Sequence, residues 1–170
     1  MTGAVELEVV PLGRYPGWIR IVARWHWDEW GRNDPDGSLG GWTERIAGWA
    51  GLDGMPCTLV AVSNGVPVGS VSLLAEDRSY ADQCAGLSPW LSSLLVVPSH
   101  RLLGVGTRLT RAAEAQAASF GVRRLYLHTS TAQRFYAGLG WENVAEVQDR
   151  TGRPVAIMDR DLATNYGRGS

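Results

Sequence analysis

The residues best suited to bind an anion lie between Arg101 and Thr107, in the sequence RLLGVGT. This segment follows an apolar run that ends before Pro98 and precedes an alanine-rich stretch of helical composition. At such a junction, unpaired backbone N–H groups and the positive end of the helix dipole face the same space, an arrangement that binds phosphate. Gly104 and Gly106 would let the main chain approach the phosphate oxygens, and Arg101 would add positive charge. The spacing therefore indicates a phosphate-binding turn.

Other phosphate-binding sequences fit this segment less well. A dinucleotide fingerprint would need a third glycine near Leu109 and an acidic residue after the next strand. A Walker loop would need a lysine, whereas all 16 basic residues of the chain are arginines. Glycines before a helix can also form a plain tight turn, so spacing alone leaves a binding turn and a structural turn both open.

A second group of polar and aromatic residues lies in the sequence RWHWDEWGR, at residues 24–32. Asp28 and Glu29 could hold a cation, and neighbouring indole rings could add cation–π contacts. Each acid also fits a solvated helix face, and each indole fits a hydrophobic core. The tryptophans concerned are Trp25, Trp27 and Trp30.

The elements that must position these residues alternate between strands and helices. Asn64-Gly65, between two apolar runs, predicts a hairpin with a tight type I′ turn. The predicted strand, helix and strand over residues 90–129 form a βαβ-like unit that contains the turn. We predict strands at 4–10, 57–63, 66–74, 90–97 (buried on both faces), 122–129, 142–149 and 154–162, helices at 17–30, 42–49, 104–120 and 131–139, and a connecting loop at 76–89.

Composition indicates one globular domain with no metal. The chain has 170 residues, of which 45% are hydrophobic and 19% charged, enough for a substantial core. We predict a single domain at 1–162 and a frayed tail at 163–170. Cys57 and Cys84 are too few for a disulfide framework and lack the spacing of a zinc site.

Charge and hydropathy exclude several classes of partner. The net charge of −1 provides no broad basic field for nucleic acid. No apolar stretch approaches the length of a membrane span, and the first residues lack a basic segment leading into an apolar run. We therefore expect a cytoplasmic protein that binds neither nucleic acid nor membrane.

The region 90–142 resembles the acyl-CoA-binding core of the GNAT superfamily of N-acetyltransferases. Two of its motifs match at their usual separation, and the hairpin at Asn64-Gly65 stands where the family has one. The first motif, R-x-x-G-x-G, matches through Arg101, Gly104 and Gly106 after Val96-x-Pro98; the second, A-x-x-F-Y-x-x-x-G-F/W, matches through Ala132, Phe135, Tyr136, Gly140 and Trp141.

The resemblance implies the fold and the cofactor. The expected fold is of the α/β (α+β) class, with a mostly antiparallel sheet of about seven strands and about four flanking helices. A splayed pair of strands, at 91–97 and 122–128, would hold acetyl-CoA, the acyl donor. The cofactor-binding residues implied are Leu94, Leu95 and Val96 for the pantetheine arm, Arg101, Leu102, Leu103, Gly104, Val105, Gly106 and Thr107 for the pyrophosphate, and Thr129 through its hydroxyl.

The chain departs from the family pattern in three regions: the turn, residue 129 and the central strand. Leu102 replaces a frequent glycine and Leu103 a commonly polar residue, while Thr129 replaces a frequent asparagine. The strand position that often carries a glutamate base holds Ser92 or Ser93 here. Water or a residue elsewhere would then have to accept the proton of the amine.

Amine attack on a thioester also needs a proton for the departing thiolate. In the family, the tyrosine equivalent to Tyr136 supplies it, although Phe135-Tyr136 could instead pack a short helix on the sheet. His100 and His128 are conceivable proton carriers, but a rim position and a half-buried, hydrogen-bonded position explain them equally well. We leave both histidines out of the predicted catalytic set.

These observations lead to three functional hypotheses. The first is acetylation of a primary amine on a small molecule, with the acceptor held by Trp27, Asp28 and Glu29, because the family builds its acceptor site from the first helices. The second is acetylation of a peptide or protein N-terminus. The third is a non-catalytic acyl-CoA sensor, suggested by the missing glutamate. Family habit also makes a homodimer plausible.

Overall fold

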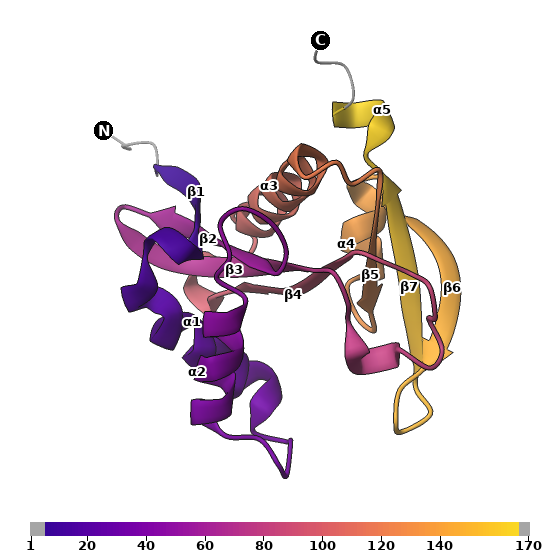
Figure 1. The fold of residues 1–170 in the computed structure, drawn as a ribbon, viewed down its shortest axis with the longest axis horizontal. Coiled ribbons are helices and arrows are strands. Elements are labelled where there is room, and N and C mark those ends of the chain that lie inside the picture. Colours follow the sequence, from indigo (N-terminus) through magenta and orange to yellow (C-terminus); the bar gives the residue numbers. More distant parts are fainter. Residues whose placement is uncertain (1–5, 167–170) are drawn as a thin grey trace. The chain divides into compact units, whose positions relative to one another are not determined.

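The computed structural model describes residues 6–166, which form two compact units. Within the described residues, unit 1 comprises 6–73 and 93–113, and unit 2 comprises 74–92 and 114–166. The chain thus passes from unit 1 to unit 2, returns within a strand, and crosses again within a long helix (Figure 1).

Seven strands form a mixed sheet in the order β1-β2-β3-β4-β5-β7-β6. The pairs β1–β2, β2–β3, β5–β7 and β6–β7 are antiparallel, and β4–β5 is parallel. This confirms the predicted fold class. The strands are β1 (Leu7–Pro11), β2 (Cys57–Ser63), β3 (Val66–Leu74), β4 (Trp90–Val96), β5 (Arg124–Thr129), β6 (Glu142–Gln148) and β7 (Pro154–Asp161). Part of the first predicted strand, 4–10, lies outside the described residues.

The hairpin of β2 and β3 follows from its turn residues. Asn64 and Gly65 have φ values of 49° and 78°, the left-handed conformation that a type I′ turn requires at both central positions. All seven residues of β2 are buried.

Five α-helices occur within residues 6–166: α1 (Ile19–His26), α2 (Leu39–Gly48), α3 (Val105–Ser119), α4 (Gln133–Gly138) and α5 (Ala163–Tyr166). The predicted helix at 17–30 is made of three pieces, because a 3₁₀ turn at Pro16–Trp18 precedes α1 and a π-helical turn at Trp27–Gly31 follows it. Helix α2 begins before the predicted residue 42, since the Ser38 hydroxyl caps it by accepting the N–H of Gly41 at 3.0 Å. Short 3₁₀ turns also lie at Leu12–Arg14, Arg78–Tyr80 and Pro98–His100. None of the helices in the described part is both long and apolar enough to cross a membrane.

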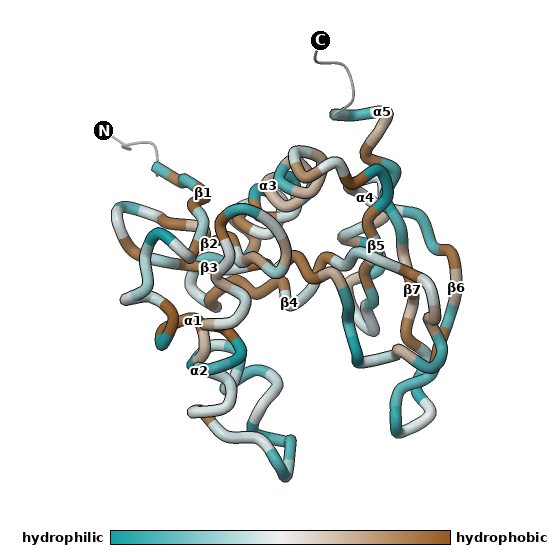
Figure 2. The backbone as a smooth tube through the Cα atoms, viewed as in Figure 1, coloured by the Kyte–Doolittle hydropathy of each residue, from teal (hydrophilic) through white to brown (hydrophobic). Residues whose placement is uncertain are grey.

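Each unit has its own hydrophobic cluster. In unit 1, α1 and α2 pack on β2, and the buried residues are Leu12, Val22, Ala23, Trp42, Ile46, Val60 and Val62. In unit 2, the cluster contains Cys84, Trp90, Val147, Val155 and Ile157. Figure 2 shows apolar residues along β7, whereas the loop between β6 and β7 is hydrophilic.

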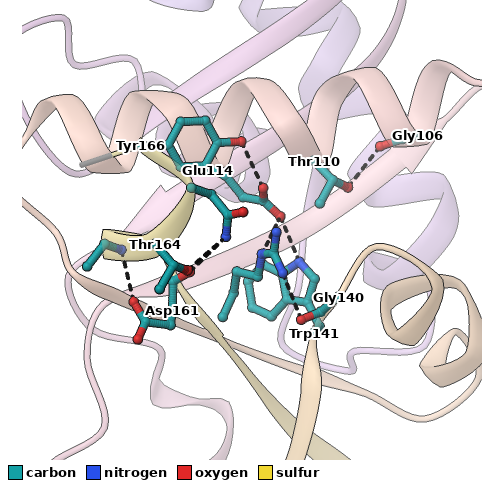
Figure 3. Close-up of polar contacts among 11 residues, drawn as sticks. Gly106, Thr110, Glu114, Gly140, Trp141, Asp161, Thr164 and Tyr166 are labelled. Carbon is teal, nitrogen blue, oxygen red and sulfur yellow. Dashed lines mark hydrogen bonds and ion pairs between the residues drawn. The ribbon is translucent and has the colours of Figure 1, made fainter. Parts of the chain in front are cut away.

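The prediction of a frayed tail from residue 163 is wrong for its first four residues. Ala163–Tyr166 form α5, whose first N–H is bound by the Asp161 carboxylate at 2.9 Å. The Tyr166 hydroxyl donates to Glu114 of α3 at 3.0 Å (Figure 3). The hydrogen bond to the buried Glu114 holds Tyr166, and with it α5, against α3. Residues 167–170 lie outside the described part.

Candidate active site

The predicted phosphate turn ends in the first turn of α3. Gly104 takes a φ of 82°, and its carbonyl accepts the first helical hydrogen bond, from the Arg108 N–H at 3.0 Å. The N–H groups of Val105, Gly106 and Thr107 precede that bond and so have no acceptor within the helix. Three donors therefore converge at the positive end of a 15-residue helix, a favourable place for a phosphate.

The two leucines of the turn point their side chains away from the protein. Leu102 is fully exposed and has a φ of 61°, which is strained for a residue with a Cβ. Leu103 is also exposed. The backbone conformation that explains a frequent glycine is thus adopted here by leucine, with no packing to offset the strain.

Arg101 connects the turn to the end of β4. Its Nε donates to the Val96 carbonyl at 3.0 Å, which occupies one of the main-chain groups expected to bind pantetheine. Leu95 is buried and Leu94 half-buried, so the prediction that this strand is buried on both faces is wrong in its middle. Ser93 has a φ of 56°, a left-handed residue that interrupts the regular strand.

The pairing of β4 with β5 is short. Its register within the described residues consists of one pair, Trp90 with Tyr126, supported by a hydrogen bond from the Tyr126 N–H to the Pro89 carbonyl at 3.0 Å. Two strands that splay apart can pair over a short stretch only, so this short pairing is consistent with the splayed pair expected from the sequence.

Tyr136 lies on α4 and is buried, with 6% of its surface exposed. Its ring makes edge contacts with Phe135 and Trp141, at centroid distances of 5.0 and 6.0 Å. Burial raises the pKa of the Tyr136 phenol well above its usual range. The phenol therefore keeps its proton, the state that a proton donor needs.

The Gly-Trp end of the second motif has a structural explanation that sequence reasoning missed. Glu114, fully buried on α3, accepts from Trp141 Nε1 at 2.9 Å and lies 3.7 Å from Arg160 (Figure 3). Arg160 also donates to the Gly140 carbonyl at 2.9 Å. Gly140 has a φ of 90°, and a Cβ there would overlap the Arg160 guanidinium. The left-handed φ therefore explains the glycine, and the guanidinium packs against it.

A histidine–carboxylate pair in unit 2 is the main feature that sequence reasoning did not find. His128 Nε2, on β5, lies 3.1 Å from Asp77 Oδ2, in the segment predicted as a connecting loop. Asp77 also accepts from the Ser79 N–H at 2.9 Å and from the Ser92 hydroxyl at 3.3 Å. Burial acts to raise the pKa of Asp77, but the hydrogen bonds from His128 and Ser79 outweigh it and hold that pKa well below its usual range. A polar loop far along the chain offers no spacing rule that would have paired these residues.

Asp77 also lines a cavity of about 270 Å³ formed by residues 76–90. The residues that line it also include Glu76, Arg78 and Trp90. The Trp90 ring also lies 6.1 Å from that of His128. The cavity combines an aromatic wall with charged groups of both signs.

The predicted acceptor residues lie in the π-helical turn of unit 1. Trp27 packs against the hydrophobic cluster, as the core interpretation expected. Asp28 accepts from Arg32 Nε at 3.0 Å and from Arg24 Nε at 3.1 Å, and the hydrogen bond from Arg32 is the main cause of its lowered pKa. Its charge is therefore already compensated, while Glu29 is exposed.

The remaining predicted residues have local partners. The Thr129 hydroxyl accepts from the Ala132 N–H at 2.9 Å, so it shapes the turn before α4. His100 Nδ1 lies 2.9 Å from the Ser99 hydroxyl.

Comparisons with known proteins identify the family. The model of the acetyltransferase (GNAT) family matches residues 19–141, and the chain belongs to this family. No curated protein sequence matches it.

Solved structures share the fold at low sequence identity. An aminoglycoside 6'-N-acetyltransferase complexed with coenzyme A is 18% identical, with a TM-score of 0.73 over 91% of this chain and 97% of that one. Ard1 from Thermoplasma volcanium is 17% identical, with a TM-score of 0.67 over 92% and 98% of the two chains. Arabidopsis thaliana Naa50, in complex with the bisubstrate analogue CoA-Ac-MVNAL, is 17% identical, with a TM-score of 0.64 over 92% and 99%.

Proposed function

We propose that this protein is an acetyl-CoA-dependent N-acetyltransferase that acts on a primary amine of a small molecule. The observation that carries the proposal is the start of α3, where three helical N–H groups follow the left-handed Gly104. In a chain of the GNAT family, this turn is suited to the pyrophosphate of coenzyme A.

The residues of the turn fit that group chemically. The N–H groups of Val105, Gly106 and Thr107 would donate to phosphate oxygens, and the guanidinium of Arg101 keeps nitrogens besides the Nε bound to Val96. Leu94 and Leu95 would offer main-chain groups to the pantetheine arm. When bound, acetyl-CoA would supply the acetyl group as a thioester.

Tyr136 would protonate the sulfur that leaves. Its phenol is held in the protonated form by burial, and its ring is fixed by Phe135 and Trp141. We assign no role in acetyl transfer to Glu114, because its contacts explain it as a buried structural acceptor.

A small cationic amine is the acceptor that the cavity in unit 2 favours. Two acidic residues, Glu76 and Asp77, line it against one basic residue, Arg78, and Trp90 adds an aromatic side chain. Aminoglycoside acetyltransferases share this fold. So does Naa50, whose structure contains the peptide-bearing analogue CoA-Ac-MVNAL. We therefore retain acetylation of a peptide N-terminus as the alternative to be tested. We also expect a cytoplasmic location, which suits the free thiols of Cys57 and Cys84.

The test is thiol release from acetyl-CoA over a panel of amines. The panel contains an aminoglycoside, a polyamine, amino-acid-derived amines and a short peptide with a free N-terminus. We expect the small cations to accelerate release more than the peptide does. Preference for the peptide would favour the alternative, and binding of acetyl-CoA without release for any amine would favour a sensor.

A further inference from the structure

Any amine acetyltransferase must remove a proton from the acceptor nitrogen, and β4 supplies no carboxylate for this step. The two candidate positions hold Ser92 and Ser93. The Ser92 hydroxyl donates to Asp77, and Ser93 adopts a left-handed backbone. A side chain that accepts this proton must therefore come from another element.

His128 has the geometry of such a base. The Asp77 carboxylate can only accept hydrogen bonds, so His128 Nε2 at 3.1 Å must carry the hydrogen that it donates. In the neutral ring this leaves Nδ1 as the basic nitrogen. The His128 side chain is 26% exposed, whereas that of Asp77 is 7% exposed. The ring is thus oriented by a buried carboxylate and remains accessible to a proton.

The surroundings of Asp77 hold it in place for this role. Oδ1 is held by the Ser79 N–H, and Oδ2 faces both Ser92 and His128. The Tyr80 ring packs edge-on against His128, with centroids 4.8 Å apart. Of the titratable side chains, those of Asp77 and Tyr80 contact the ring.

Resting on the proposed acetyltransferase function, we propose that His128 is the general base of the reaction and that Asp77 is its positioning residue. The acceptor loses its first proton to solvent and attacks as the neutral amine. As the N–C bond forms and the C–S bond breaks, His128 Nδ1 takes the second proton from that nitrogen, and Tyr136 gives its proton to the departing sulfur. Solvent then returns the proton from His128 to Tyr136, so the step balances without another reactant.

The experiment compares His128→Gln with His100→Gln in single-turnover acetyl transfer across a range of pH. Both substitutions remove an imidazole, but the His100 ring lies against the neutral Ser99 hydroxyl, whereas the His128 ring faces the Asp77 carboxylate. We expect His128→Gln to lower the rate by about 10²-fold or more at each pH, while the Kd for acetyl-CoA stays unchanged. His100→Gln should keep the wild-type profile.

Asp77→Asn tests whether Asp77 orients His128 for the reaction or only stabilises the fold. Loss of the carboxylate removes the charged acceptor that orients the ring, so Asp77→Asn should lower the single-turnover rate by less than His128→Gln does, while the Kd for acetyl-CoA stays unchanged. A purely structural role would lower thermal stability and leave the rate per folded molecule unchanged. The inference is overturned if wild-type protein acetylates an amine and either His128→Gln or Asp77→Asn keeps the wild-type rate. If the wild type acetylates no amine, the proposed function itself has failed.

Discussion

Two histidines, one in each unit, have opposite surroundings. His26 in unit 1 is fully buried, its Nε2 lies 3.2 Å from the Ser70 hydroxyl, and its ring touches Trp30 and Trp42. Burial, helped by the positive charge of Arg45, lowers the pKa of His26 to about 4. His128 in unit 2 is partly exposed and faces a buried carboxylate. The residue type is the same, but only the second environment supports proton transfer.

The same contrast extends to the other functional candidates. In unit 1 the polar groups suited to function are backbone donors, at the start of α3. In unit 2 they are titratable side chains: Tyr136, His128 and Asp77. We therefore expect substitutions in unit 1 to affect binding or stability and substitutions in unit 2 to affect the rate of the reaction.

The largest expected effect is that of Tyr136→Phe, which tests whether unit 2 carries the chemistry. The substitution removes one hydroxyl and preserves the ring contacts with Phe135 and Trp141. Because general-acid assistance contributes about 10²- to 10⁴-fold, the single-turnover rate should fall by that order while the Kd for acetyl-CoA changes little.

Tyr126→Phe is the matched control, since it removes a phenolic hydroxyl from β5 in the same unit. Its rate should stay close to that of the wild type. Equal rates for the two variants, with both folds confirmed by circular dichroism, would assign Tyr136 to packing alone.

The second effect concerns the pH dependence of stability and tests the His26 half of the comparison. The pKa of His26 falls from 6.5 in the unfolded chain to about 4 in the folded one, so the unfolded state binds the proton first as the pH drops. The stability that comes from keeping His26 neutral and buried is therefore fully present above pH 6.5, and it is lost progressively as the pH falls toward 4. A shift of this size corresponds to about 3 kcal/mol.

Urea unfolding of the wild type and of His26→Gln over this pH range measures the effect. The slope of the free energy of unfolding against pH should be smaller in the variant, whatever its absolute stability. Parallel slopes would show that His26 is not the buried neutral group described above.

The third effect tests whether the turn of unit 1 binds the cofactor. Gly104 and Gly65 have φ values of 82° and 78°, and a Cβ at either would meet open space. Valine at either position should therefore cause similar backbone strain, about 1–2 kcal/mol. Only Gly104→Val should also weaken acetyl-CoA binding, by about tenfold, which corresponds to about 1.4 kcal/mol in calorimetry. Equal affinities in the two variants would remove the turn from the cofactor site.

Sequence patterns predicted the fold better than the catalytic pair, for physical reasons. The hairpin, β4, α3 and the antiparallel end follow from local periodicity and turn residues such as Asn64-Gly65, which act over a few neighbouring positions. The turn before α3 was predictable for the same reason. The pairing of Asp77 with His128 spans 51 positions and joins a loop to a strand, and Glu114 meets Trp141 across 27 positions. Contacts of this kind depend on tertiary packing, which no local pattern encodes.

A fourth, smaller effect tests the strain at Leu102. Replacing this exposed, left-handed leucine with glycine removes strain of about 1–2 kcal/mol at the cost of about 0.5–1 kcal/mol of chain entropy. Leu102→Gly should therefore raise the free energy of unfolding. Leu103 is exposed but not left-handed, so Leu103→Gly should lower that free energy. A change of the same sign in both variants would show that Leu102 is not strained.

The smallest effect concerns the acids of the π-helical turn. Asp28 is compensated by Arg24 and Arg32, so Asp28→Asn combined with Glu29→Gln should raise the KM of the acceptor only slightly, by no more than about fivefold. The KM of acetyl-CoA should stay constant, since these residues lie outside the turn. A large rise in the acceptor KM would move the acceptor site into unit 1 and break the proposed division of roles.

The most direct test of the account follows the acetyl group itself. Wild-type protein is incubated with acetyl-CoA labelled in the acetyl carbon and with the amine that gives the fastest thiol release. The account predicts one labelled acetamide for each thiol released, with the label on the amine nitrogen. Thiol release without labelled amine, which is hydrolysis of the thioester, would contradict it.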